Sequence, residues 1–145
     1  MFVDATAIVA MLSNEAEAER CARAIVDAST PFTSAIAAWE AAMALARPEK
    51  LAIPVARSAE IVSRFLEERA IALRELPPAP EAASLSVEAA SRFRSKAIRL
   101  NMADCFHYAC ARYYAVPMLS TAGEFRLTDL ETVPWPTAPP LPNRA

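Results

Sequence analysis

The chain has 145 residues, of which 54% are hydrophobic and 22% charged, and its formal net charge at pH 7 is −2. This length is typical of one domain, and the apolar content is enough for a sizeable core, so a wholly disordered chain is excluded. The near-neutral charge excludes a strongly basic coat that binds nucleic acid of any sequence, but it leaves a local basic patch open.

Hydrophobic periodicity predicts alternating strands and helices. Residues 1–3 form a short apolar run typical of a buried parallel strand, and apolar residues spaced by three and four mark the helices. In chain order, we predict a strand at 1–3, a helix at 15–28, a strand at 31–34, helices at 35–46 and from 55 onward, a strand near 71–73, helices at 85–97 and 103–114, and strands at 116–120 and 130–133. This alternation indicates an α/β fold with a parallel sheet, helices on both faces and the last strand at an edge.

The end of the chain has a different composition from the rest. Five of the twelve prolines fall within residues 134–145. Proline neither continues a helix nor pairs in the middle of a sheet. We therefore expect one domain over residues 1–133 and an extended tail over 134–145.

Several features bound the compartment and the class of the protein. No run of about 18 apolar residues is present, so we expect no membrane-spanning helix. The N-terminal segment lacks the basic region of a signal peptide, which predicts a cytoplasmic protein. The three cysteines have no zinc-binding spacing, and we expect buried free thiols. Because Gly123 is the single glycine, nucleotide-binding loops of the Rossmann and Walker A types are excluded.

Carboxylates follow several of the predicted strands. In parallel α/β sheets the functional crevice lies beyond the carboxyl ends of the strands, so acids there converge. The candidates are Asp4 after the first strand, Glu40 in the helix after the second, Asp104 near the start of a later helix, and Glu124 and Asp129 after the fourth strand. Such a cluster needs a cation, and oxygen ligands favour Mg²⁺ or Mn²⁺, which serve phosphoryl chemistry.

Each acid also has a purely structural interpretation. Asp4 can be an ordinary acid at the end of a strand, and a salt bridge would satisfy Glu40 on its apolar helix face. The helix dipole favours Asp104 in a first helical turn. Glu124 and Asp129 are plausible turn residues. Periodicity alone therefore predicts only an acidic α/β domain.

Four segments carry short motifs in a particular order. They are MFVDATAIVA at 1–10 with Glu15 just beyond, Thr33-Ser34 followed by Trp39-Glu40, LNMADCFHYA at 100–109, and Met118-Leu119 followed by the acids of 124–129. Together they resemble the PIN-domain ribonucleases of the VapC toxin type, whose signature L-N-x-G-D-C-x-x-Y-A is matched by the third segment. The resemblance spans residues 1–133. It implies a three-layer α/β/α PIN-like domain with a central parallel sheet of four or five strands.

The resemblance also implies roles for the acids. Asp4, Glu40 and Asp104 would be the ligands of a divalent metal, and one of them or the metal would activate water for attack on an RNA phosphodiester. Relatives often carry two acids where this chain has Gly123-Glu124. By position and charge, the resemblance therefore implies Glu124 as the fourth catalytic and metal-binding acid, with Asp129 as its substitute.

Other polar residues near these acids are candidates for supporting roles. Thr6 and Ser34 would orient the metal ligands. We interpret His107, the only histidine, as a residue at the rim of the site or on the helix face rather than as a catalytic base. A run of cations before the third motif is either a solvated face or a contact for RNA phosphates. It comprises Arg92, Arg94, Lys96 and Arg99.

The function implied by the resemblance is a Mg²⁺- or Mn²⁺-dependent endoribonuclease that is the toxin of a type II toxin–antitoxin pair. Its partners would be RNA, a small VapB-like antitoxin and a second copy of the chain, with no membrane involved. A PIN-like nuclease of RNA maturation or DNA flaps, without antitoxin, is the first alternative. A haloacid-dehalogenase-type phosphatase is weaker, because Thr6 stands where that family has a second aspartate. A domain that binds RNA or protein without cleavage is the third alternative, and the acids at Asp4, Glu40 and Asp104 argue against it.

Overall fold

The sheet has five parallel strands within residues 1–134, the part of the chain that this computed structural model describes. They are β1 (Phe2–Val3), β2 (Phe32–Ser34), β3 (Ala72–Arg74), β4 (Met118–Leu119) and β5 (Thr132–Val133), in the order β3-β2-β1-β4-β5. The chain moves outward from β1 to β3 and then returns to the other side of β1 as β4. The strand order thus reverses at β1, where open α/β sheets place their binding crevice.

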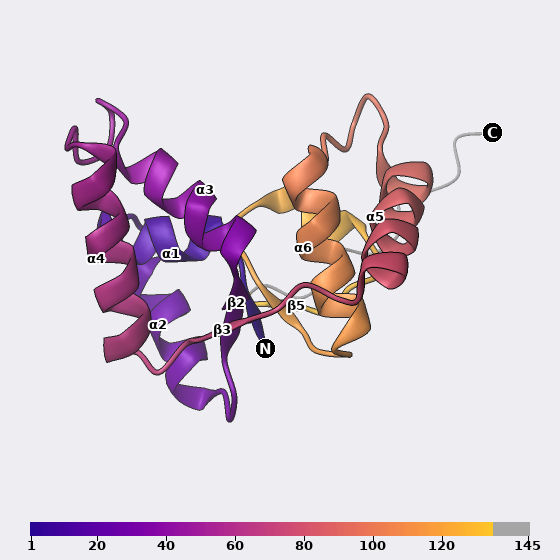
Figure 1. Cartoon of the computed structure of the whole chain (residues 1–145), viewed down its shortest axis with the longest axis horizontal. Helices are drawn as coiled ribbons and strands as arrows, with labels where there is room; N and C mark the ends of the chain where they lie inside the picture. Colours follow the sequence, from indigo (N-terminus) through magenta and orange to yellow (C-terminus); the bar gives the residue numbers. More distant parts are fainter. Residues whose placement is uncertain (135–145) are drawn as a thin grey trace.

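Helices cover the sheet from two sides (Figure 1). They are α1 (Ala5–Leu12), α2 (Ala18–Asp27), α3 (Ala35–Leu45), α4 (Val55–Glu68), α5 (Ala79–Phe93) and α6 (Met102–Tyr113). In Figure 1 the strands lie between α1–α4 on the left and α5 and α6 on the right. The predicted three-layer α/β/α architecture with a parallel sheet of four or five strands is therefore confirmed.

The core lies where the sheet meets these helices. The strand residues Phe2, Phe32, Met118 and Leu119 are all at most 2% exposed. The rings of Phe2 and Phe32 meet edge to face, with centroids 5.8 Å apart. Burial of this apolar area is the main stabilising term of the fold, at about 25 cal/mol per Å². It also fixes the strand ends that carry the polar residues.

The structure adds one helix and moves another. Helix α1 directly follows β1. Its sequence ATAIVAML is apolar except for one threonine, and residues 7–10 are all buried, so the helix has no polar face. Without a polar face it gives no amphipathic signal. The helix predicted at 85–97 begins instead at Ala79, with a proline in its first turn, and it ends at Phe93, before the extended backbone of Arg94.

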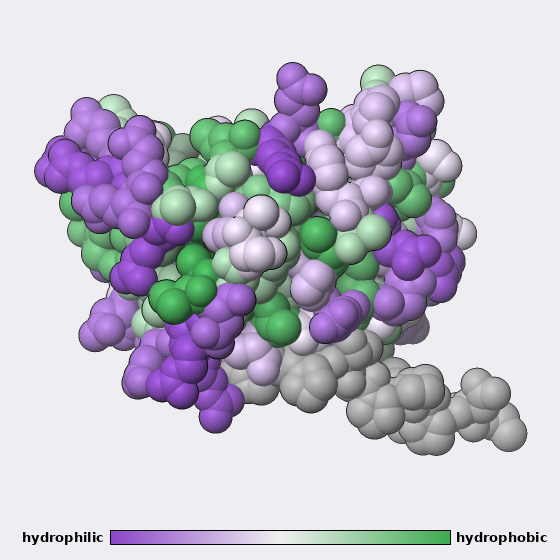
Figure 2. All heavy atoms as spheres, turned by 90° about the horizontal axis from the view of Figure 1, so that it is seen from below, coloured by the Kyte–Doolittle hydropathy of each residue, from purple (hydrophilic) through white to green (hydrophobic). Residues whose placement is uncertain are grey.

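The cysteines, the helix lengths and the surface complete the description of the fold. All three cysteines are buried and free, as expected. Among residues 1–134, no helix is both long and apolar enough to cross a bilayer. Figure 2 views the molecule from the side on which the N-terminus lies in Figure 1, and hydrophobic residues gather there between two hydrophilic regions. The predicted tail lies outside the described residues, apart from Pro134.

Candidate functional site

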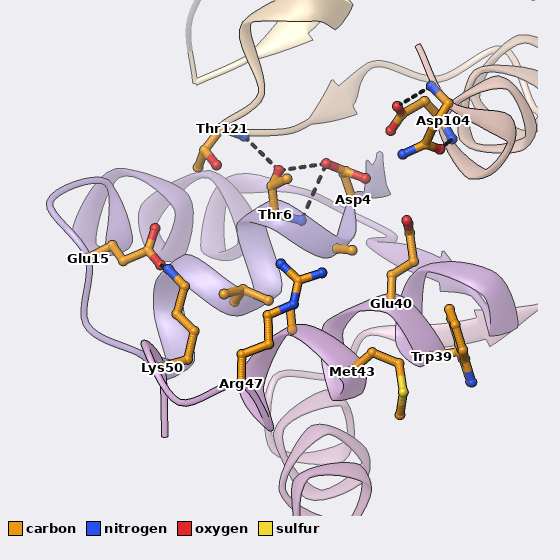
Figure 3. Close-up of a pocket in the computed structure, with 14 residues that line it drawn as sticks. Asp4, Thr6, Glu15, Trp39, Glu40, Met43, Arg47, Lys50, Asp104 and Thr121 are labelled. Carbon is orange, nitrogen blue, oxygen red and sulfur yellow. Dashed lines mark hydrogen bonds and ion pairs between the residues drawn. The ribbon is translucent and has the colours of Figure 1, made fainter. Parts of the chain in front are cut away.

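Three of the predicted acids line one pocket of about 420 Å³ at the carboxyl edge of the sheet (Figure 3). Asp4 follows the central strand β1 and caps α1, Glu40 lies in α3, and Asp104 lies in the first turn of α6. The three elements come from distant parts of the sequence. They meet because parallel strands end at the same edge, and α3 and α6 start there.

Asp4 is the most firmly held of the three acids. It is 2% exposed, and its Oδ2 accepts hydrogen bonds from Thr6 Oγ1 at 2.5 Å and from Ser120 Oγ at 2.8 Å. The backbone N–H of Thr6 donates to the same oxygen at 3.3 Å. The Thr6 hydroxyl is itself fixed by the N–H of Thr121 at 3.1 Å. Thr6 therefore donates to Asp4 through both its hydroxyl and its backbone N–H, and Ser120 is an additional donor that its position at the end of β4 could have indicated.

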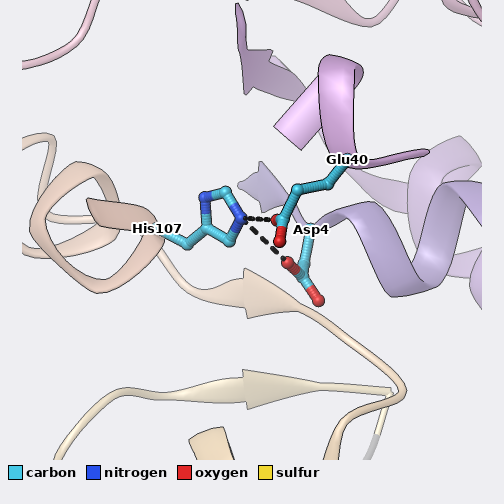
Figure 4. A group of neighbouring side chains, drawn as sticks. All are labelled: Asp4, Glu40 and His107. Carbon is cyan, nitrogen blue, oxygen red and sulfur yellow. Dashed lines mark hydrogen bonds and ion pairs between the residues drawn. The ribbon is translucent and has the colours of Figure 1, made fainter. Parts of the chain in front are cut away.

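Glu40 and Asp4 face the side chain of His107 (Figure 4). The Nε2 of His107 lies 2.5 Å from Glu40 Oε2 and 3.7 Å from Asp4 Oδ1. His107 is completely buried, so it is not the rim residue that the sequence suggested. Burial lowers its pKa, but the hydrogen bond to Glu40 and the charge of Asp4 outweigh burial and raise the pKa above its ordinary value.

Asp104 is held by the end of its own helix. Its Oδ2 accepts from the N–H of Asn101 at 2.8 Å, and the Asn101 side chain accepts from the Asp104 N–H at 2.9 Å, which forms a capping box. Burial, together with the neighbouring charges of Asp4 and Glu40, raises the pKa of Asp104 to about 6, although the Asn101 hydrogen bond opposes the shift. The acids of this pocket therefore repel one another.

Two cations, Arg47 and Lys50, also line the pocket. Lys50 forms an ion pair with Glu15, and Ser13 also donates to that carboxylate. The Arg47 guanidinium points into the pocket in Figure 3 and forms no hydrogen bond or ion pair with the described residues. Trp39, at the pocket edge, is 63% exposed. The pocket thus holds Asp4, Glu40 and Asp104 on one side and the Glu15–Lys50 pair on the other, with the Arg47 side chain between them (Figure 3).

The remaining predicted site residues lie elsewhere. Ser34 is buried, and its hydroxyl accepts from the N–H of Ala37, so it caps α3 rather than touching an acid. Glu124 lies in the 3₁₀ turn η1 (Gly123–Leu127) and does not line the pocket. Asp129 does not line it either: Oδ2 pairs with Arg92 and Oδ1 accepts from the Tyr108 hydroxyl, both at 2.9 Å.

The predicted cationic run is divided between two environments. Arg92, near the end of α5, is engaged by Glu88 and Asp129. Arg94, Lys96 and Arg99 lie in the exposed segment between α5 and α6 and form no ion pair with the described residues. That segment leads directly into the first turn of α6 and Asp104, so these three cations remain available to a phosphate chain.

The donor set of the pocket fits a divalent cation. Ligand atoms of Asp4, Glu40 and His107 lie within 4.8 Å of one another, and Asp104 lines the same pocket. Carboxylate oxygens are the donors that Mg²⁺ and Mn²⁺ prefer. Burial and, to a smaller extent, the charges of Asp4 and Glu40 raise the pKa of Asp104, and a cation would stabilise its ionised form against both.

Comparison with known proteins agrees with this geometry. The PIN domain family profile matches residues 1–129. A protein named ribonuclease VapC from Mycolicibacterium smegmatis is 30% identical over 134 residues, which cover 92% of this chain and 99% of the relative. Ribonuclease VapC30 from Mycobacterium tuberculosis is 29% identical over 137 residues, which cover 94% of this chain and 100% of the relative.

A solved structure shares the fold. The crystal structure of Mycobacterium tuberculosis VapC20, described as a Sarcin-Ricin loop cleaving toxin, superposes with a TM-score of 0.67 at 15% identity. The match covers 89% of this chain and 95% of that one. With the sequence matches over nearly the whole chain, these findings show that the protein belongs to the PIN domain family.

Proposed function

We propose that the protein is a divalent-metal-dependent endoribonuclease and the toxin of a type II toxin–antitoxin pair. The observation that carries this proposal is the meeting of Asp4, Glu40 and Asp104 in one pocket of a PIN domain. Relatives that match over nearly their full length bear the name ribonuclease VapC. Oxygen ligands and a phosphodiester substrate are chemically matched through Mg²⁺ or Mn²⁺.

The three acids would hold the cation, and their neighbours would set their positions. When bound, a divalent cation supplies Lewis acidity, which makes water a stronger nucleophile at neutral pH and offsets charge on the phosphate. Thr6 and Ser120 hold Oδ2 of Asp4 in place, which leaves Oδ1 directed toward Glu40 and His107. Glu124 does not line the pocket, so its role as a fourth metal-binding acid stays a prediction from the sequence.

The cations near the pocket would hold the RNA strand. Arg47 offers a planar guanidinium that can bind phosphate oxygens in pairs. Arg94, Lys96 and Arg99 lie in the segment that leads to Asp104 and would contact phosphates further along. Such contacts position a strand without reading its sequence. They allow a chain with a formal charge of −2 to bind a polyanion at one face.

The test is cleavage of structured RNAs by the purified chain in Mg²⁺, in Mn²⁺ and in EDTA. Asp4→Asn removes one buried charge of the pocket, while Asp27→Asn removes an exposed acid at the end of α2 as a matched control. We expect metal-dependent cleavage by the wild type and by Asp27→Asn, and a loss of at least about 100-fold in Asp4→Asn. Metal-independent cleavage, or equal rates in all three proteins, would contradict the proposal.

We further propose an antitoxin and a second copy of this chain as partners, meeting RNA in the cytoplasm. An apolar hollow of about 270 Å³ lies between α3 and α4, and side chains that are 63%, 48% and 61% exposed line it, namely Trp39, Val55 and Leu73. Exposed apolar groups gathered in this way favour protein contacts. Light scattering tests the dimer. Co-purification with the product of a short upstream reading frame tests the antitoxin, and its absence favours a nuclease of RNA maturation.

A further inference from the structure

His107 combines complete burial with one satisfied and one unsatisfied nitrogen. Its Nε2 lies 2.5 Å from Glu40 Oε2, whereas Nδ1 has no hydrogen-bond partner among the described residues. The ring packs against Phe2, with centroids 5.6 Å apart and planes tilted by 34°. The orientation of the imidazole is therefore fixed by packing on one side and by a carboxylate on the other.

Two roles are open to an imidazole at this place, and they differ in whether Nε2 carries a proton. As a metal ligand, Nε2 would carry a lone pair, and the ring proton would sit on Nδ1. As a hydrogen-bond donor to Glu40, Nε2 would carry a proton, either in the neutral ring with Nδ1 bare or in the imidazolium with both nitrogens protonated. Histidines that bind metals almost always donate their other N–H to an acceptor.

The contacts of the two ring nitrogens decide between these roles. A proton on Nδ1 would be a buried donor without an acceptor, which costs roughly as much as a lost hydrogen bond. The neutral donor form, with a bare Nδ1, has no such unsatisfied proton, and Nε2 keeps its proton in the neutral and in the charged donor form alike. The short contact to a carboxylate oxygen, which can only accept while ionised, likewise requires a proton on Nε2.

We propose that His107 is a positioning residue, whose Nε2–H holds Oε2 of Glu40 and leaves Oε1 for the cation, and that it is not itself a metal ligand. This inference rests on the proposed metal-dependent function. Glu40 has several rotatable bonds and is 25% exposed, so without a donor its carboxylate would have to be ordered when the cation binds. The hydrogen bond joins α6 to α3 and thus links the two walls of the pocket.

The protonation of the two ring nitrogens can be observed directly, because the chain contains one histidine. In a ¹⁵N spectrum of the full chain, a proton on Nε2, both in EDTA and with saturating Mg²⁺, is expected. Transfer of the proton to Nδ1, or loss of the Nε2 proton when Mg²⁺ is added, would overturn the proposal. The wild-type protein suffices, so folding of a variant is not at issue.

A pair of variants separates positioning from ligation and from a merely structural role. His107→Gln keeps an N–H donor near Glu40, whereas His107→Leu removes it. We expect Mn²⁺ affinity, measured by calorimetry on the folded proteins, to fall by about 10–100-fold in His107→Leu and by much less in His107→Gln. A structural role would lower the melting temperature but leave the affinity unchanged, and a ligand would lose affinity equally in both variants. Either result overturns the proposal.

Wild-type measurements in the same series separate this inference from the proposed function. If the wild type binds Mn²⁺ and cleaves RNA while His107→Leu binds Mn²⁺ equally well, the positioning role fails alone. If the wild type binds no divalent cation, the metal-dependent function fails, and the positioning role fails with it. If the wild type binds Mn²⁺, unchanged Mn²⁺ affinity in folded His107→Gln and His107→Leu would therefore contradict the His107 proposal alone.

Discussion

Asp104 and Asp129 are both acids that the sequence offered as metal ligands, yet their surroundings are opposite. Burial raises the pKa of Asp104 to about 6, with help from the charges of Asp4 and Glu40. The pKa of Asp129 is instead lowered: burial raises it, but the Tyr108 hydroxyl and Arg92 outweigh burial. One carboxylate is crowded by like charge, and the other already has a cation and a donor.

The difference shows how a cation site is distinguished from a structural acid. Asp129 is satisfied within the fold, so adding a metal ion would require breaking its contacts with Arg92 and Tyr108. Asp104 has an unfavourable electrostatic environment that a divalent cation would improve. Position at a strand end brings an acid near the crevice, but the surrounding charges decide whether it is a candidate ligand.

The largest expected effect separates Glu40 from Glu124, one inside the pocket and one outside it. Glu40→Gln removes a charge that faces Asp4 and His107, and we expect metal-dependent RNA cleavage to slow by at least about 100-fold. For Glu124→Gln we expect a loss of no more than about tenfold, the low end of the 10–100-fold effects of losing an outer contact, because Glu124 does not line the pocket. Single-turnover rates in Mg²⁺ measure both, and equal losses would place Glu124 in the metal site.

Removing the Asp129 side chain, and with it the acceptor of the Tyr108 hydroxyl, should lower the stability of the fold. Tyr108 is completely buried, and Asp129→Ala leaves its hydroxyl without this acceptor. We expect the free energy of unfolding in urea to fall by about 1–3 kcal/mol, with Mn²⁺ affinity unchanged. The double variant Asp129→Ala/Tyr108→Phe should recover part of that loss, because donor and acceptor are then both absent. Additive losses would show that the hydrogen bond contributes nothing.

The two acids should also change stability with pH in opposite directions. Because the pKa of Asp104 is raised from 3.8 to about 6, its contribution to stability is fully present below about pH 4 and is lost as pH rises through about 6. Asn is neutral at every pH. In EDTA, Asp104→Asn should therefore be more stable than the wild type near pH 8, and the gap should narrow below about pH 6 and close below about pH 4.

Asp129 should show the reverse pattern. The pKa of Asp129 is lowered in the folded protein. Its contribution to stability is therefore present when the pH is above the ordinary pKa of an aspartate, and it is lost as the pH falls through the folded-state pKa. Asp129→Asn should thus be less stable than the wild type at neutral pH, and this gap should narrow on acidification. Urea unfolding of Asp104→Asn, Asp129→Asn and the wild type, from acidic pH to pH 8 in EDTA, checks both predictions. Slopes of the same sign would remove the distinction between the two acids.

The smallest effect concerns RNA binding by the cations. In the Asp4→Asn protein, which should not cleave its RNA, Arg47→Gln should weaken RNA binding several-fold. The slope of log K against log salt concentration should fall in magnitude by about 0.7, because one phosphate contact is lost. Arg64, exposed on α4 and outside the pocket lining, provides the matched control Arg64→Gln. Fluorescence anisotropy at several salt concentrations measures both. If the two variants bind RNA alike, Arg47 has no specific contact.

The sequence predicted the layers of the fold and the acids that meet, because these depend on local periodicity and on strand ends. Asp4 and Thr6 are adjacent in sequence, so their hydrogen bond could be anticipated. The contact between His107 and Glu40 could not, since it depends on how α6 packs against α3. Helix α1 is apolar except for Thr6, so it gave no amphipathic signal, and Ser34 proved to be a helix cap.

Direct measurement of Mn²⁺ binding tests the central claim, that Asp104 belongs to a cation site and Asp129 does not. Calorimetric titrations would compare the wild type, Asp104→Asn and Asp129→Asn under identical conditions. The account predicts saturable binding in the wild type, nearly equal affinity in Asp129→Asn, and at least about tenfold weaker binding in Asp104→Asn. Equal affinity in Asp104→Asn and the wild type, or a larger loss in Asp129→Asn, would contradict it.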